Sequence, residues 1–151
     1  MTHIEELARR AQETGTVIAV AESLTSGNLA ATIGAAEGAG DWFAGGVVAY
    51  RLETKHRVLD LAEGIDPCSP ECAEQLARAV RDLTGADLAV SATGVGGPEP
   101  HDGHEPGTVY LGWSDGDDTG HVLLELDGEP EQVIDDSVNA AVGLLIDRMR
   151  P

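Results

Sequence analysis

The segment VAYRLETKHRVLDL, residues 48–61, contains Lys55, the only lysine of the 151-residue chain. The other basic side chains are eight arginines. A lysine that is removed from water can lose its proton and act as a base, whereas an arginine stays protonated. The single lysine, five residues after Tyr50, therefore marks a candidate reaction centre. The alternative is a surface lysine on a short helix.

Three turns rich in glycine or hydroxyl residues offer candidate ligand contacts. AESLTSGN precedes a small-residue helix, and the N-terminus of a helix favours an anion. GAGDWFAGG precedes a strand, and SATGVGGPEPHDGHEPGT forms a long loop of the kind that is more often functional than idle. These patterns predict a small-molecule site, with a phosphate-bearing ligand as one option and plain turn and capping roles as the alternative. The predicted substrate-binding residues are Ser23, Thr25, Ser26, Gly40, Trp42, Phe43, Thr93, Gly94, Gly97 and Pro98.

The elements that must position these residues alternate along the chain. Apolar, β-branched runs predict strands at 16–22, 45–52, 86–94, 107–115 and 121–127. Helical spacing of apolar residues predicts helices near the N-terminus, after the first strand, and at 54–59, 70–85 and 130–149. The tight turn GDDTG between the last two strands predicts an antiparallel hairpin. The expected fold is a three-layer α/β/α sandwich with a mixed sheet of about five strands, formed by residues 1–151 as a single domain.

The net charge of −18 is the most unusual feature of the composition. Because 27 acids are spread along the whole chain, its surface repels phosphate backbones, and nucleic-acid binding through a basic face is not expected. Adaptation to high salt explains such a surface, with an ordinary acidic protein as the alternative. No apolar run is long enough for a membrane span or a signal peptide, which predicts a cytoplasmic protein.

Metal-ligating residues do not form a convincing set. Cys68 and Cys72 are four residues apart, but no second pair completes a site of about four ligands. His101 and His104 lie in the glycine- and proline-rich loop, where a solvated role is the simpler interpretation. We therefore expect no metal and no cofactor.

Several ordered motifs together resemble the C-terminal domain of the CinA family, which also occurs alone as a nicotinamide mononucleotide deamidase. The motifs are AESLTSG, DWFAGGVVAY followed by ETK, SATGVGGPEP and PGTVYLGW. The resemblance implies hydrolysis of the carboxamide of nicotinamide mononucleotide, with release of ammonia and nicotinic acid mononucleotide, without a cofactor and in a homo-oligomer. It implies catalytic roles for Tyr50 and Lys55, which activate a serine nucleophile, and places Trp42 and Phe43 beside them.

The sequence departs from the family pattern at positions that bear on chemistry. The family's G-S-S-x-W-F reads GAGDWF here, so the position of the implied nucleophile is Gly40. In the first motif, Leu24 replaces a cysteine and Ser26 a glycine. The segment 127–138, DGEPEQVIDDSV, lacks the arginines of the family's G-D-R motif.

Three interpretations follow from these departures. The protein is a deamidase in which a hydroxyl of Ser23, Thr25 or Ser26 attacks, or in which Lys55 and Tyr50 activate a water. Alternatively, it is a non-catalytic nucleotide-binding homologue, because Gly40 has no side chain. The third interpretation is an enzyme that acts on a different small amide or nucleotide.

Overall fold

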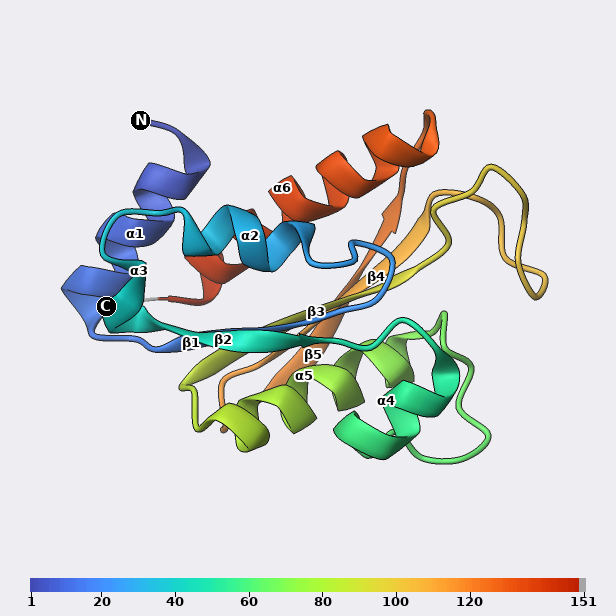
Figure 1. The fold of residues 1–151 in the computed structure, drawn as a ribbon, viewed down its shortest axis with the longest axis horizontal. Helices are drawn as coiled ribbons and strands as arrows, with labels where there is room; N and C mark the ends of the chain where they lie inside the picture. The colour runs from blue at the N-terminus through green and yellow to red at the C-terminus, as the bar shows by residue number, and fades with distance from the viewer. Residues whose placement is uncertain (150–151) are drawn as a thin grey trace.

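The computed structural model describes residues 1–149, and its centre is a five-stranded mixed sheet (Figure 1). The strand order is β2-β1-β3-β4-β5. Strand β1 pairs in parallel with β2 and β3, whereas β4 is antiparallel to both β3 and β5. The strands are β1 (Ile18–Glu22), β2 (Phe43–Val48), β3 (Leu88–Gly94), β4 (Thr108–Ser114) and β5 (Thr119–Glu125).

Helices cover both faces of the sheet, so the predicted three-layer α/β/α architecture is confirmed (Figure 1). One face carries α1, α2, α3 and α6, and the other carries α4 and α5. No helix among residues 1–149 has the length and apolar character needed to span a membrane. The helices are α1 (His3–Thr14), α2 (Asn28–Gly34), α3 (Ala39–Trp42), α4 (Leu52–Leu59), α5 (Pro70–Thr84) and α6 (Pro130–Arg148).

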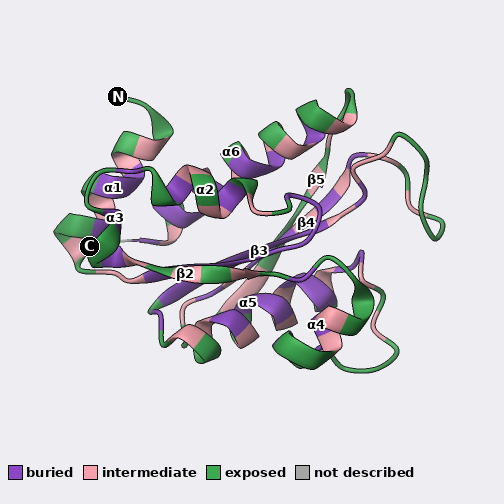
Figure 2. Ribbon diagram, viewed as in Figure 1, coloured by how far each residue is buried: buried purple, intermediate pink, exposed green. Residues whose placement is uncertain are grey.

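The central strands are apolar because both of their faces are covered. In β1, Ile18 and Val20 point to the core under α1 and α6, while Ala19 and Ala21 point to the core under α5. Figure 2 shows β1 and β3 as buried and the edge strands as mixed. The face beneath α5 is lined by small side chains, which lets this helix approach the sheet closely.

The helix ends follow the sequence signals. Ser69 accepts a hydrogen bond from the Cys72 N–H at 3.1 Å and caps α5, and Gly85 ends that helix in the left-handed conformation at φ 73°. The predicted hairpin of the last two strands is confirmed. Both boundaries of the second strand differ from prediction: β2 runs from Phe43 to Val48 rather than over 45–52. The short helix α3, which was not predicted, precedes it.

The parallel pairing brings three connecting segments to one end of the sheet. Because β2, β1 and β3 run in the same direction, residues 23–27, 49–51 and 95–107 all follow carboxyl ends of neighbouring strands. Open α/β sheets bind ligands at this end. The start of α5 lies there too, since its C-terminus leads into the amino end of β3.

Candidate active site

The amine of Lys55 is buried against a serine hydroxyl. Its Nζ lies 3.0 Å from Ser23 Oγ and 2.9 Å from the backbone carbonyl oxygen of Tyr50, and donates a hydrogen bond to each. Lys55 is only 2% exposed and Ser23 is 7% exposed. A serine and a buried lysine in hydrogen-bond contact form a nucleophile and base pair of the kind that amidases use.

Two segments that follow neighbouring strands create this contact. Ser23 follows β1 directly, and its N–H donates to the Ala92 carbonyl of β3 at 3.0 Å, which fixes its backbone to the sheet. Lys55 lies in the first half of α4, which a connection of three residues separates from the end of β2. Since Glu22 pairs with Val48 in the parallel register, the segments that follow β1 and β2 leave the sheet side by side.

The electrostatic surroundings of Lys55 favour the neutral amine. Burial lowers the pKa of Lys55 below its ordinary value, and the nearby thiol of Cys72 opposes that shift only in part. Burial also raises the pKa of Cys72 to about 11, so this neighbour is an uncharged thiol at neutral pH. The two hydrogen-bond partners of the amine are uncharged oxygens. A lysine in such surroundings releases its proton more easily than one in water.

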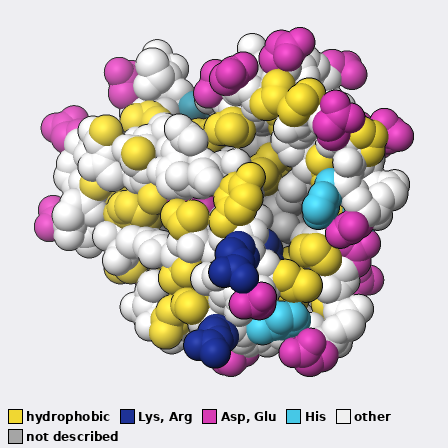
Figure 3. Space-filling model, turned by 45° about the vertical axis from the view of Figure 1, so that its right-hand side comes forward, with side chains coloured by type: hydrophobic (Ala, Val, Ile, Leu, Met, Phe, Trp, Pro, Cys, Tyr) yellow, Lys and Arg dark blue, Asp and Glu magenta, His cyan; other side chains and the backbone are white. Residues whose placement is uncertain are grey.

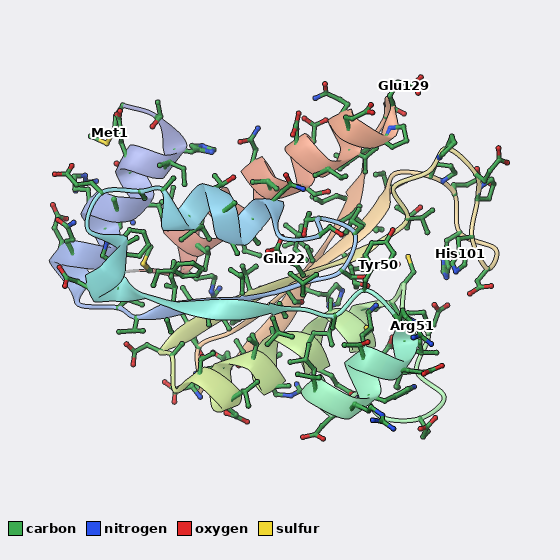
Figure 4. The ribbon with its side chains drawn as sticks, in the orientation of Figure 1. Met1, Glu22, Tyr50, Arg51, His101 and Glu129 are labelled. Atoms are coloured by element: carbon green, nitrogen blue, oxygen red, sulfur yellow. The ribbon has the colours of Figure 1, made fainter. Side chains whose placement is uncertain are left out.

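The carboxylate group of Glu22, the last residue of β1, lies at the N-terminus of α2, where the sequence predicts an anion-binding site. Its buried carboxylate accepts hydrogen bonds from the N–H groups of Gly27 at 3.2 Å, Leu29 at 2.8 Å and Ala30 at 3.0 Å. Figure 4 shows Glu22 beneath α2. The chain's own carboxylate therefore fills the position that was expected to receive a ligand anion. Sequence reasoning gave Glu22 no role, although an acid that ends an apolar strand just before a helix was a usable signal.

The turn after Ser23 leaves polar groups without partners. The hydroxyl of Thr25 is buried and bonds to no group among residues 1–149. No described residue accepts a hydrogen bond from the N–H of Leu24 or of Thr25, the two that follow Ser23. Ser26 lies in the left-handed region at φ 50°. Backbone N–H groups directly after a nucleophile are the donors that form oxyanion holes.

Tyr50 reaches this centre through its backbone. Its side chain is 64% exposed, and its hydroxyl makes no hydrogen bond within the described part of the chain. Thr93 lies near the end of β3, where its hydroxyl donates to the Pro67 carbonyl at 2.6 Å. Gly94 ends β3, and Gly97 and Pro98 lie in the loop that follows, at the same end of the sheet as Lys55.

Gly40, Trp42 and Phe43 are not brought together with Lys55 within the chain. Gly40 and Trp42 lie on α3, and Phe43 begins β2, whereas Lys55 lies beyond the other end of that strand. A strand of six residues spans roughly 20 Å. Trp42 is buried in the core beside α1 and donates its indole N–H to the Glu37 carbonyl at 3.3 Å.

The potential metal ligands are dispersed. Residues 1–149 contain no group of three or more His, Cys, Asp or Glu side chains with the geometry of a metal site. Cys68 and Cys72 are buried free thiols. His104 Nε2 lies 2.7 Å from Asp66 Oδ2, which ties the long loop to the segment before α5.

Comparisons with known proteins place this arrangement in a family. The sequence profile of the CinA C-terminal domain matches residues 1–149. The chain belongs to this family. A competence-damage inducible protein of Bacillus velezensis is 43% identical over 116 residues, which cover 74% of this chain and 28% of that protein. Another, from Halalkalibacterium halodurans, is 34% identical over 152 residues, which cover 97% of this chain and 36% of that protein.

Solved structures of CinA proteins share the fold. The crystal structure of competence damage-inducible protein A from Klebsiella pneumoniae is 30% identical, with a TM-score of 0.93 over 97% of this chain and 94% of that one. A CinA superfamily protein from Escherichia coli is 26% identical, with a TM-score of 0.92 over 95% and 87% of the two chains. The CinA domain described here thus spans nearly all of these solved chains, but only about a third of the two curated relatives.

Proposed function

We propose that this CinA domain is an amidohydrolase that converts nicotinamide mononucleotide to nicotinic acid mononucleotide and ammonia. The contact between Ser23 Oγ and Lys55 Nζ, at 3.0 Å, is the observation that carries the proposal. The substrate follows from the family resemblance, and the buried serine–lysine pair supplies chemistry suited to a carboxamide. No cofactor is required for this reaction.

The first half of the reaction acylates the serine. The neutral amine of Lys55 takes the Ser23 proton as Ser23 Oγ attacks the carboxamide carbon. The unpartnered N–H groups of Leu24 and Thr25 are suited to stabilise the oxyanion. The protonated Lys55 then gives its proton to the departing nitrogen, which leaves as ammonia. The Tyr50 carbonyl holds the amine in place throughout by its 2.9 Å hydrogen bond.

The second half hydrolyses the ester. A water enters where ammonia left, Lys55 accepts its proton, and the resulting hydroxide attacks the ester carbonyl. The tetrahedral intermediate collapses, the Ser23 oxygen recovers a proton from Lys55, and the carboxylate product leaves. The net reaction consumes one amide and one water and yields one carboxylate and one ammonium, so the enzyme returns to its starting state.

If Ser23 is the nucleophile, the glycine at position 40 no longer argues against catalysis. The non-catalytic interpretation rested on the missing side chain at that position, but Gly40 lies on α3, at the opposite end of β2 from Lys55. A serine there would not contact Lys55 of the same chain, whereas Ser23 does. We therefore expect Gly40→Ser to leave the rate unchanged, and an increase would favour a decayed site instead.

The decisive experiment measures ammonia release from nicotinamide mononucleotide in about 2–3 M KCl, where the acidic surface is screened. Ser23→Ala and Lys55→Ala should each lower kcat by more than about a thousandfold, as loss of a nucleophile or its base does in hydrolases. Ser26→Ala is the matched control, because it removes a hydroxyl from the same turn and should retain most of the activity. Full activity in Ser23→Ala would remove Ser23 as the nucleophile.

A further inference from the structure

Basic side chains are scarce in this chain, yet three of the nine lie within seven residues. Arg51, Lys55 and Arg57 fall in the segment 51–57, whose single acid is Glu53. Lys55 is buried, whereas both arginines are exposed. Figure 3 shows dark-blue side chains on the face turned forward, with acidic side chains mostly along its edges. Because an acidic surface repels anions, a phosphate-bearing substrate needs a local cation to bind.

Arg51 is the residue after Tyr50 and lies on the segment that holds the Lys55 amine. Its own peptide bond joins it to Tyr50, whose carbonyl oxygen accepts the hydrogen bond from the Lys55 amine. The guanidinium itself lies at the surface, with its side chain 72% exposed. Figure 4 shows Tyr50 and Arg51 on the segment between β2 and α4, on the same side of the molecule as the loop that carries His101. Arg51 therefore combines an exposed guanidinium with a backbone position one residue from the group that holds the Lys55 amine.

The present partner of Arg51 is easily exchanged. The guanidinium lies 3.0 Å from Glu53 Oε1, but the side chain of Glu53 is 74% exposed. Ion pairs this exposed contribute little to stability. A phosphate dianion can accept two parallel, charge-assisted hydrogen bonds from a guanidinium and carries more negative charge than a carboxylate. Binding of phosphate would therefore replace Glu53 at small cost.

Other potential anion sites near the reaction centre are already occupied or acidic. The N–H groups of α2 bind the Glu22 carboxylate. The segment before α6, where the family carries arginine, begins with Asp127 and Glu129. Arg148, at the other end of α6, stacks on the Trp113 ring with its Cζ 3.6 Å from the centroid. Arg51 directly follows Tyr50, whose carbonyl oxygen accepts the hydrogen bond from the Lys55 amine.

We infer that Arg51 forms a subsite for the phosphate monoester of the substrate and takes over the role of the arginines missing from residues 127–138. The inference rests on the proposed deamidase function and makes it more specific: the enzyme selects a phosphorylated ribose over the free riboside through this side chain. Arg51 is then a binding residue that acts on affinity for the nucleotide and leaves the Ser23–Lys55 chemistry unchanged.

The test compares kcat/KM for nicotinamide mononucleotide and for nicotinamide riboside in the wild type, Arg51→Gln and Arg57→Gln. Arg51→Gln should lower kcat/KM for the mononucleotide by about 10- to 100-fold, chiefly through KM, since a charge-assisted pair is lost. Its kcat/KM for the riboside should stay within about twofold of the wild type. Arg57→Gln removes the same charge six residues further along the chain, within α4, and should behave as the wild type.

Other results would contradict the proposal that Arg51 forms a phosphate subsite. An equal loss on both substrates would show a general disturbance of the site, and an equal loss in Arg57→Gln would show a diffuse effect of net charge. If the wild type hydrolyses neither substrate, the proposed function fails, and calorimetry with ribose 5-phosphate then tests the subsite separately. Binding that is weakened in Arg51→Gln but not in Arg57→Gln supports it, and the absence of binding to the wild type refutes it.

Discussion

Replacement of Glu22 by glutamine tests whether the carboxylate at the end of β1 organises the turn that carries Ser23. The carboxylate is 1% exposed and accepts three backbone hydrogen bonds, two at Oε1 and one at Oε2. Glutamine keeps one acceptor oxygen, so the bonds from Gly27 and Leu29 can survive. Its amide group would then face the Ala30 N–H, and two donors would oppose each other.

The expected loss of stability follows from these contacts. One hydrogen bond to a charged group contributes about 1.5–3 kcal/mol. A negative charge at a helix N-terminus contributes about 0.3–1 kcal/mol more. Because glutamine is less costly to bury than a carboxylate, part of this is recovered, and we expect Glu22→Gln to lower the free energy of unfolding by about 2–3 kcal/mol. Turnover should fall as well, because the same contacts hold the turn of residues 23–27.

Denaturant unfolding at fixed KCl, with linear extrapolation, measures the free energy of unfolding. Glu71→Gln is the matched control, since Glu71 is an exposed acid in the first turn of α5 and its neutralisation should cost less than about 1 kcal/mol. A loss in Glu22→Gln no larger than that in Glu71→Gln would show that the three short contacts do not stabilise the turn, and the reasoning would be wrong.

Four further predictions concern the amine, the packing and the surface. Lys55→Met should abolish ammonia release yet raise the free energy of unfolding at pH 7 by about 1 kcal/mol, because folding then no longer buries an amine that is protonated in the unfolded chain. The wild type should regain that difference as the pH rises from the lowered Lys55 pKa toward 10.5. In this range the amine is neutral in the folded protein but still protonated in the unfolded chain, so the free energy of unfolding increases with pH. For the same reason kcat should rise with pH and level off below 10.5, which a pH–rate profile checks, and a profile that is flat through this range would exclude Lys55 as the base. Gly112→Ala should cost about 1–3 kcal/mol because its Cβ would meet the Ala73 carbonyl of α5, whereas Gly40→Ala, with open space around it, should change stability by less than about 1 kcal/mol. The melting temperature should rise between low and multimolar KCl as the −18 charge is screened, and a melting temperature that does not rise would argue against adaptation to high salt.

The fold was largely predictable because its signals are local. Apolar runs of five to seven residues, the capping residues Ser69 and Gly85, and the turn before β5 each depend on neighbouring positions. The errors lie where tertiary packing moves a boundary. Strand β2 ends at Val48, because the chain turns into α4 there, and Tyr50 therefore leaves the sheet.

The candidate site was predictable only as a set of residues. Sequence alone ranked Ser23, Thr25 and Ser26 equally, since each is a hydroxyl in the same turn. The choice depends on the parallel register that sets Glu22 against Val48 and brings the Lys55 amine to Ser23, 32 residues away. Side-chain direction within a five-residue turn follows from such long-range contacts, which no local pattern contains.

The position of Glu22 also explains how a strongly acidic chain keeps one lysine amine free of a salt bridge. A carboxylate next to Lys55 would hold its proton and remove it as a base. Glu22 is the residue before Ser23, yet its two oxygens are taken by the N–H groups of α2, and the amine bonds instead to a hydroxyl and a carbonyl. The contacts that order the Ser23 turn therefore also withhold the adjacent negative charge from Lys55. Loss of this arrangement in Glu22→Gln should affect the rate through the position of Ser23 rather than through the Lys55 pKa, so the variant's pH–rate profile should fall in height without moving along the pH axis.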